Sequence, residues 1–237
     1  MKIIFKTFKE KWPEYFLEIL VITLGILGAF ALNSWNDNRK AKDVQRQTVA
    51  RMIDDLESDQ RRYQYLQRRM EDRRSRCDSV LTLFDQQRTV EDRKAIIGVH
   101  LINFFLVEAN TTTYEEMLNT GRIYALGDDK LRSRITRYYN LVNKWSTYVE
   151  KGNNQLRDRM IQQVYGDYWL IQQTIRLGRP VDLQKYPWLK EIYSREINDI
   201  EALIYRTYQM FDDNLKAIGY LDDVSESLLK ELKGQGE

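Results

Sequence analysis

The chain has 237 residues, of which 43% are hydrophobic and 30% are charged, and its formal net charge is +2. This near balance provides no global positive field for nucleic acid, and the single cysteine, Cys77, excludes an intramolecular disulfide and a multi-cysteine zinc site. With only 3 prolines and 11 glycines, the composition favours long helices over sheet or disorder, so we expect an all-α protein.

A membrane anchor is predicted at the start of the chain. Residues 1–14 form a short basic tail, and residues 15–35 (YFLEILVITLGILGAFALNSW) are the one run long and apolar enough to cross a bilayer. About 20 residues at about 1.5 Å per residue span about 30 Å, which is the thickness of the hydrocarbon core. Trp12 and Trp35 flank the run as interfacial aromatic residues do. The lipid bilayer is therefore the first expected partner.

The same run has a second interpretation as a cleaved signal peptide. Lysines precede it, and Ala29-Phe30-Ala31 matches a cleavage pattern. The length of the run and the presence of Glu18 inside it favour an uncleaved anchor instead.

The basic tail also bears on orientation. A short lysine-rich tail is hard to translocate, which favours a cytoplasmic N-terminus, although basic residues between 39 and 46 nearly cancel the bias. We expect the chain in the inner membrane of a bacterium, with the C-terminal domain in the periplasm.

One face of the predicted anchor carries small and polar residues. At about 100° per residue, Gly25 and Ala29 lie within about 20° of Glu18, and Ile22 and Asn33 lie on the same side. A carboxyl group, an amide and small residues that let backbones approach closely are typical of associating transmembrane helices. We expect this face to pack on another transmembrane helix. The alternative is that Glu18 extends to the lipid headgroups and the small residues are incidental.

A long helix with a heptad pattern is predicted over residues 36–90, which contain no proline or glycine. Apolar residues recur every seven positions, at Val49, Leu56, Tyr63, Met70, Cys77 and Phe84. Met52, Leu66 and Val80 occupy the position three later, where Asp59 and Arg73 interrupt the pattern. This seam indicates either a stalk that associates with a second copy or the first long helix of a bundle.

An arginine-rich stretch lies within this predicted helix. Residues 61–76 contain seven arginines and two tyrosines, and basic residues interleaved with aromatic ones can mark nucleic-acid binding. Tyr63 lies on the seam, however, and acidic residues between 54 and 59 precede the stretch. We therefore expect a solvated helix face and no nucleic-acid partner.

The remaining residues, 91–237, are expected to form a helical bundle domain. Residues 95–107 (AIIGVHLINFFLV) are apolar but too short to span a membrane, so they predict a buried core helix. His100, the only histidine, is expected to be a packed core residue, because no second histidine exists to share a metal ion with it.

A capped short helix and a long helix are predicted next. Asn110 and three following threonines offer N-caps and Gly121 offers a C-cap, which gives a two-turn helix between them. Asp128 and Asp129 then start a long amphipathic helix whose apolar stripe runs from Leu131 through Tyr148. Adjacent aspartates at a helix start are typical of capping, so we do not expect a catalytic carboxylate pair there.

The C-terminal third contains a long loop around residues 178–188 and a further amphipathic helix. The apolar stripe of this helix steps by three or four residues from Ile197 to Ile218, and a last short helix is predicted from Val224 to Leu232. Aromatic residues gather around the loop at Tyr165, Tyr168, Trp169, Tyr186 and Trp188. Such a cluster either fills the irregular end of a bundle or lines a ligand pocket.

Two segments, EILVITLGILGAFALNSWND and TTYEEMLNTGRIYALGDDKLRSRITRYYN, carry a resemblance to a family. The chain resembles an uncharacterised family of bacterial single-pass inner-membrane proteins. The family pattern has an anchor that ends in Asn-x-Trp-Asn, then a Thr-x-(Tyr/Phe)-x-Glu-Leu-x-x-(Ser/Thr)-Gly element and Leu-Arg-x-x-Ile-x-x-Tyr-Tyr. Matching positions in the second segment include Tyr114, Glu116, Gly121, Leu131, Arg132 and Tyr138. Leu17 stands where the family often has Gly, and Met117 replaces the usual Leu. The resemblance implies an anchored helical domain and brings no catalytic residue with it.

The functional expectation is a protein that is not an enzyme. The sequence contains no phosphate-binding glycine motif, nucleophile elbow or histidine-containing acid-base set, so we predict no catalytic residue, no cofactor and no metal site. The expected role is an oligomeric scaffold or accessory subunit of an inner-membrane or envelope complex, with a second copy or another integral membrane protein as partner. The alternative is a membrane-anchored sensory or ligand-binding helical module.

Overall fold

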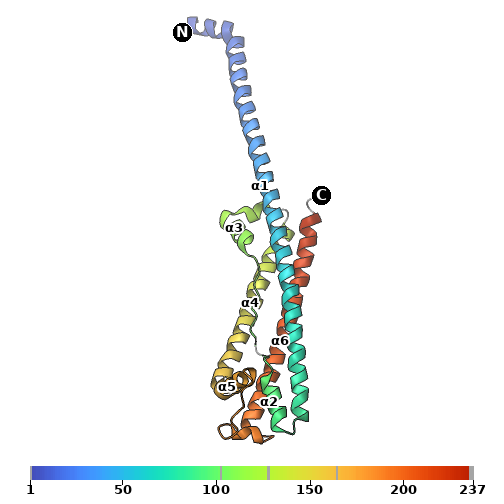
Figure 1. Cartoon of the computed structure of the whole chain (residues 1–237). Coiled ribbons are helices and arrows are strands. Elements are labelled where there is room, and N and C mark those ends of the chain that lie inside the picture. Colours follow the sequence, from blue (N-terminus) through green and yellow to red (C-terminus); the bar gives the residue numbers. More distant parts are fainter. Residues whose placement is uncertain (1, 102, 127–128, 164, 235–237) are drawn as a thin grey trace. The chain divides into compact units, whose positions relative to one another are not determined.

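A computed structural model describes residues 2–101, 103–126, 129–163 and 165–234, without the side chains of residues 2–11, 13–15, 162–163 and 165. Within these ranges the regular structure is helical and contains no strand, which confirms the expected all-α class (Figure 1). The helices are α1 (Lys2–Gln86), α2 (Val90–Gly98), α3 (Thr112–Thr120), α4 (Asp129–Gln163), α5 (Tyr165–Arg176) and α6 (Arg195–Gly234), with short 3₁₀ turns η1 (Arg122–Ala125) and η2 (Pro187–Lys190).

Contacts divide the chain into two compact units, residues 1–50 and residues 51–237. We call them the N-terminal unit and the C-terminal unit. The boundary lies inside the long helix predicted over residues 36–90, so the part of α1 from Arg51 to Gln86 belongs with the predicted bundle.

The N-terminal unit contains the apolar run. Among the described residues, α1 is the one helix that is long and apolar enough to cross a membrane; an 18-residue window in it has a mean hydropathy of 2.1, and none of that window is buried. Leu17, Ile26 and Phe30 are between 63% and 70% exposed, so the chain itself does not cover them. Length and composition make this run a candidate membrane span.

Three long helices form the core of the C-terminal unit: Arg51–Gln86 of α1, α4 and α6 (Figure 1). Glu57 pairs with Lys233 at 2.7 Å and Arg74 pairs with Asp212 at 2.9 Å, so α1 and α6 run antiparallel. Fully buried apolar and aromatic side chains from all three helices fill the space between them: Leu56, Tyr63, Met70, Ile135, Tyr138, Ile204, Phe211 and Ile218. Burial of such side chains is the main stabilising term of the unit.

Helices α2 and α5 close one end of this unit (Figure 1). A capping box begins α2, because Asp92 N–H donates to the Thr89 hydroxyl while Thr89 N–H donates to the Asp92 carboxylate. Arg93 is buried and donates from Nε to the Leu189 carbonyl oxygen at 2.6 Å. The cap fixes the start of α2, and the Arg93 hydrogen bond attaches α2 to η2.

The predicted core helix over residues 95–107 is wrong. Helix α2 ends at Gly98, and the described residues from Val99 to Thr111 form an irregular segment, which we call the connecting segment. Leu101 and Val107 are buried, but His100 is exposed, so the expectation of a core histidine is also wrong. An apolar run specifies burial without specifying helix, and here the burial is achieved without one.

The predicted short helix from Val224 to Leu232 is not a separate element. Helix α6 runs without a break from Arg195 to Gly234, and Ser225, Leu228 and Leu232 are buried on it. The two-turn helix before Gly121 is confirmed, as α3 spans Thr112–Thr120 and Gly121 caps it with φ of +70°.

Gly121 gives a test of this cap. A left-handed backbone costs a residue with a Cβ roughly 1 kcal/mol, so we expect Gly121→Ala to lower the free energy of unfolding by about that amount. Gly219→Ala is the matched control, because Gly219 lies within α6 and an added Cβ meets only Gln67 Nε2 at 3.8 Å. There we expect a gain of up to about 1 kcal/mol. Urea unfolding of the full chain in detergent, followed by circular dichroism, measures both; equal losses would contradict the cap.

Candidate functional site

The small and polar residues of the predicted anchor face lie exposed on α1. Glu18, Ile22, Ala29 and Asn33 are all exposed, and a Cβ added at Gly25 meets nothing within 4 Å. Asn33 already has one partner, because its amide donates to the Asp37 carboxylate at 3.2 Å. This face is therefore open to a partner along its length.

The heptad seam lies on the inside of the C-terminal unit. Leu56, Tyr63, Met70, Cys77 and Phe84 are buried, as are Met52, Leu66 and Val80, whereas Val49 in the N-terminal unit is half-buried. From Leu56 to Phe84 the chain itself covers the seam. Burial raises the pKa of the Cys77 thiol to about 11, so the thiol is protonated at neutral pH.

Asp59, which interrupts the seam, is the centre of a buried polar cluster. Its side chain is only 2% exposed. Oδ1 accepts the backbone N–H of Asn110 at 2.8 Å, and Oδ2 accepts the hydroxyl of Tyr138 at 2.8 Å. The Tyr63 hydroxyl lies 3.1 Å from the Tyr138 hydroxyl and completes a chain of hydrogen bonds. One carboxylate therefore connects α1, α4 and the connecting segment.

Burial sets the protonation of this cluster. Desolvation raises the pKa of Asp59 to about 6, although the hydrogen bonds from Asn110 and Tyr138 oppose the rise. Burial and the neighbouring Tyr63 and Asp59 raise the pKa of Tyr138 far above its ordinary value. Tyr138 therefore stays protonated and acts as a donor to the carboxylate.

Arg73, the other interruption of the seam, also holds the connecting segment. Its guanidinium donates to the His100 carbonyl oxygen at 2.9 Å. Asn153 of α4 donates to the Phe105 carbonyl oxygen at 2.9 Å, and Ser146 of α4 donates to that of Val107. These side chains replace the hydrogen bonds that a helix would have made within the segment.

The residues of the family pattern surround α3 and the start of α4. Tyr114 stacks on Tyr139, with ring centroids 4.1 Å apart. Glu116 accepts Arg51 at 2.6 Å and Arg122 at 2.8 Å, and both ion pairs hold α3 in place. Leu131 is fully buried. Arg132 donates to the Tyr124 carbonyl oxygen at 3.0 Å and pairs with Asp129. Together with Gly121 and Tyr138, these positions serve packing and capping within the unit.

The arginine-rich stretch is largely tied to its own chain. Arg62 pairs with Glu108, Arg74 pairs with Asp212, and Arg76 pairs with Asp72. In the aromatic cluster near the long loop, Trp169 is exposed, whereas Tyr168, Tyr186 and Trp188 are buried. The buried residues fill the end of the bundle that α2 and α5 close.

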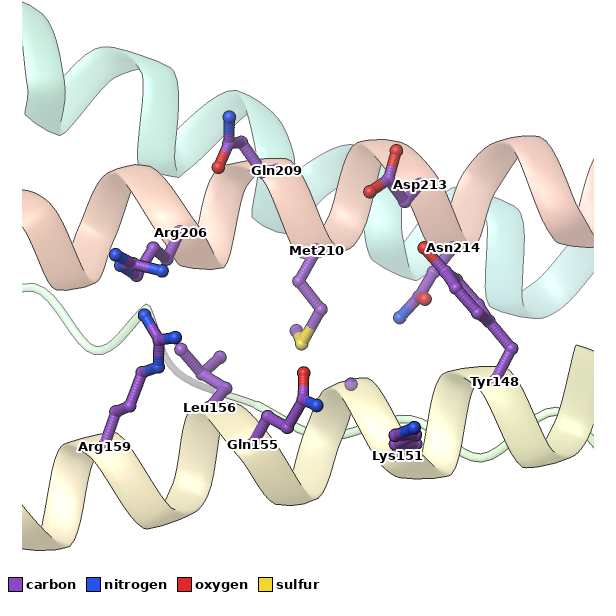
Figure 2. A pocket seen from close by; sticks show the side chains of 11 residues that line it. Tyr148, Lys151, Gln155, Leu156, Arg159, Arg206, Gln209, Met210, Asp213 and Asn214 are labelled. Carbon is purple, nitrogen blue, oxygen red and sulfur yellow. The ribbon is translucent and has the colours of Figure 1, made fainter.

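A groove of about 440 Å³ lies between α4 and α6, a site that sequence reasoning missed (Figure 2). From α4 it is lined by Tyr148, Lys151, Gly152, Gln155, Leu156 and Arg159, and from α6 by Arg206, Gln209, Met210, Asp213 and Asn214. The lining combines cationic, amide and apolar groups. Among the described side chains, no three of the His, Cys, Asp and Glu type gather as metal ligands would.

These features define a class of protein: an all-α chain in which a candidate membrane helix precedes a helical bundle. A family model matches residues 18–177, more than half of the chain, and the chain therefore belongs to a family of unknown function, DUF6090. The match includes the exposed face of α1 and all the pattern residues from Tyr114 to Tyr138, whereas α6 lies outside it. No curated protein and no solved structure matches significantly.

The polar cluster predicts a dependence of stability on pH. The folded chain keeps a proton on Asp59 up to about pH 6, whereas the unfolded chain releases it near a pKa of about 3.9. Folding therefore binds protons between these values, and this carboxyl's contribution to stability is lost as the pH rises from about 4 to above 6. We expect the free energy of unfolding of the wild type, minus that of Asp59→Asn, to fall by on the order of 2 kcal/mol over this range.

The measurement is urea unfolding of both full-length proteins in detergent at pH values from 4 to 7.5. Asp54→Asn removes a charge from an exposed position of the same helix and controls for the loss of charge itself. A difference between wild type and Asp59→Asn that stays constant or grows as the pH rises would contradict a buried, ionising Asp59.

Proposed function

We propose that this chain is a single-pass membrane protein that acts as an oligomeric scaffold or accessory subunit, without catalytic activity of its own. The observation that carries the proposal is the open face of α1 with Glu18, Gly25 and Ala29. In the proposed setting this run crosses the inner membrane of a bacterium. The basic tail lies in the cytoplasm and the C-terminal unit lies in the periplasm.

Glu18 makes a partner helix favourable, because its carboxyl group is costly to place in lipid. A carboxyl group in a spanning helix costs roughly 3 kcal/mol unless protein or water surrounds it. Glu18 is exposed on α1 and forms no ion pair or hydrogen bond with any side chain that the structure describes. A second helix that brings a donor to this position would remove much of that cost.

Gly25 and Ala29 allow a second helix to approach α1 closely. Both lie on the side of Glu18, and the space above Gly25 is empty to at least 4 Å. Small residues four apart let two helix backbones approach closely, and close approach is the main source of attraction between helices in lipid. The heptad seam is covered within the C-terminal unit, so this face is the better candidate for association.

A second candidate function is a membrane-anchored ligand-binding module. The groove between α4 and α6 favours it, because polar and apolar groups converge there in a hollow of about 440 Å³. The two functions are compatible, since the proposed contacts lie in different units.

The face on α1 predicts that Gly25→Leu reduces association of the full chain. Gly28→Leu is the matched control, because Gly28 lies about 100° around the helix from the centre of the face and an added Cβ there also meets nothing within 4 Å. Native mass spectrometry of the natively expressed protein in mild detergent measures both variants. We expect Gly25→Leu to lose at least half of its oligomer or of its co-purified partner, and Gly28→Leu to keep it.

The same measurement identifies the kind of assembly. A stoichiometric second polypeptide supports an accessory subunit, and a homo-oligomer supports a scaffold. A monomeric wild type with no bound polypeptide, or equal effects of the two leucine substitutions, would overturn the proposed face.

A further inference from the structure

We propose that the groove between α4 and α6 binds an elongated organic anion whose carboxylate or phosphate group lies between Arg159 and Arg206. This inference rests on the second candidate function, the ligand-binding module, and names the ligand class of that same site. It does not depend on the association of α1.

Two guanidinium groups converge at one end of the groove. Figure 2 shows Arg159 of α4 and Arg206 of α6 pointing toward one another across the groove. Neither has an ion pair or hydrogen bond in the part of the chain that the structure describes. By contrast, Arg74 pairs with Asp212 of α6 and Arg134 pairs with Glu231 of α6. Both groove arginines have exposed side chains, and an oxyanion between them can accept hydrogen bonds from both guanidinium groups.

Apolar groups continue the groove beyond the arginines. Leu156 is buried and Met210 is half-buried, and in Figure 2 Met210 extends from α6 toward α4 between the two ends. Arg159 and Lys151 are eight residues apart on α4, which corresponds to about 12 Å along the helix. A ligand that fills this length has an apolar body behind its anionic group.

Asn214 marks the other end. Its side chain is only 3% exposed, its amide nitrogen has no hydrogen-bond partner, and Figure 2 shows the amide pointing into the groove. The comparable buried Asn153 does use its amide nitrogen, on the Phe105 carbonyl oxygen. Other buried donors, such as Trp145 Nε1 and Trp188 Nε1, also have no partner among the described residues, but Asn214 is the one that lines the groove. The ligand therefore presents a neutral acceptor such as a hydroxyl to Asn214.

Charge fixes the direction in which the ligand lies. At the Asn214 end the groove is lined by one cation, Lys151, and one anion, Asp213, whereas the other end is lined by two arginines. The cationic excess is therefore at the Arg159 and Arg206 end. An anionic head at the arginines and a hydroxyl tail at Asn214 match both ends.

The test uses the full chain in detergent and three related compounds: 8-hydroxyoctanoate, 8-hydroxyoctyl phosphate and the uncharged octane-1,8-diol. Isothermal titration calorimetry measures binding to the wild type and to Arg159→Gln, Arg206→Gln and Asn214→Leu. Arg157→Gln is the matched control, because it removes the same charge from α4 at a side chain that lies over the Phe104 ring instead. Far-UV circular dichroism checks that each variant is folded.

We expect at least one anion to bind and the diol to bind more weakly. Each groove arginine variant should raise the dissociation constant about tenfold, as the loss of a charge-assisted hydrogen bond does, and Arg157→Gln should change it less than twofold. Preference for the carboxylate or for the phosphate identifies the head group, and either supports the proposal.

Two results would contradict the proposed anion site, and each contradicts a different part of the proposal. Equal binding of the diol and the anions, or binding that the groove arginine variants leave unchanged, would reject the anion and keep a ligand-binding groove. Failure of all three compounds to bind would reject the ligand-binding function of the groove as well.

Discussion

The structure of the C-terminal unit depends on a carboxylate placed where an apolar side chain is expected. Asp59 lies in the seam of α1, yet it is buried and accepts hydrogen bonds from Tyr138 of α4 and from the backbone of Asn110. A buried backbone without regular structure must find partners for its N–H and carbonyl groups. Asp59 and Arg73 provide them near the two ends of the connecting segment, at Asn110 and His100.

This explains why part of the fold could be predicted from the sequence and part could not. Periodicity depends only on apolar positions, so it indicated α1, α4 and α6 and the seam from Leu56 to Phe84, while capping residues indicated α3. It treated Asp59 and Arg73 as defects of a zipper. These two residues bind the connecting segment. Periodicity does not show such hydrogen bonds, so it predicted a helix over residues 95–107. An acid and a base at heptad positions of a long helix were the available signal, and it indicated a polar partner segment.

The face on α1 and the groove between α4 and α6 also differ in whether the sequence could predict them. The face with Glu18, Gly25 and Ala29 could be predicted because all its residues lie on one helix, where spacing alone places them. The groove could not, because Arg159 and Arg206 are 47 residues apart in the chain (206 − 159) and converge only when α4 and α6 lie side by side. Their register depends on contacts such as that of Arg134 with Ser227 at 2.7 Å. The family match covers the α4 side of the groove and stops before the α6 side.

The antiparallel pairing of α1 with α6 has a consequence for biosynthesis. Glu57 and Lys233, which pair across the two helices, are 176 residues apart in the chain. At about 5 to 20 residues per second, a ribosome needs roughly 10 to 35 s to bridge that distance. During this interval α1 has no α6 to pack against on the side where Glu57 and Arg74 lie. A chaperone that shields α1 until α6 has been synthesised would therefore raise the yield of folded protein.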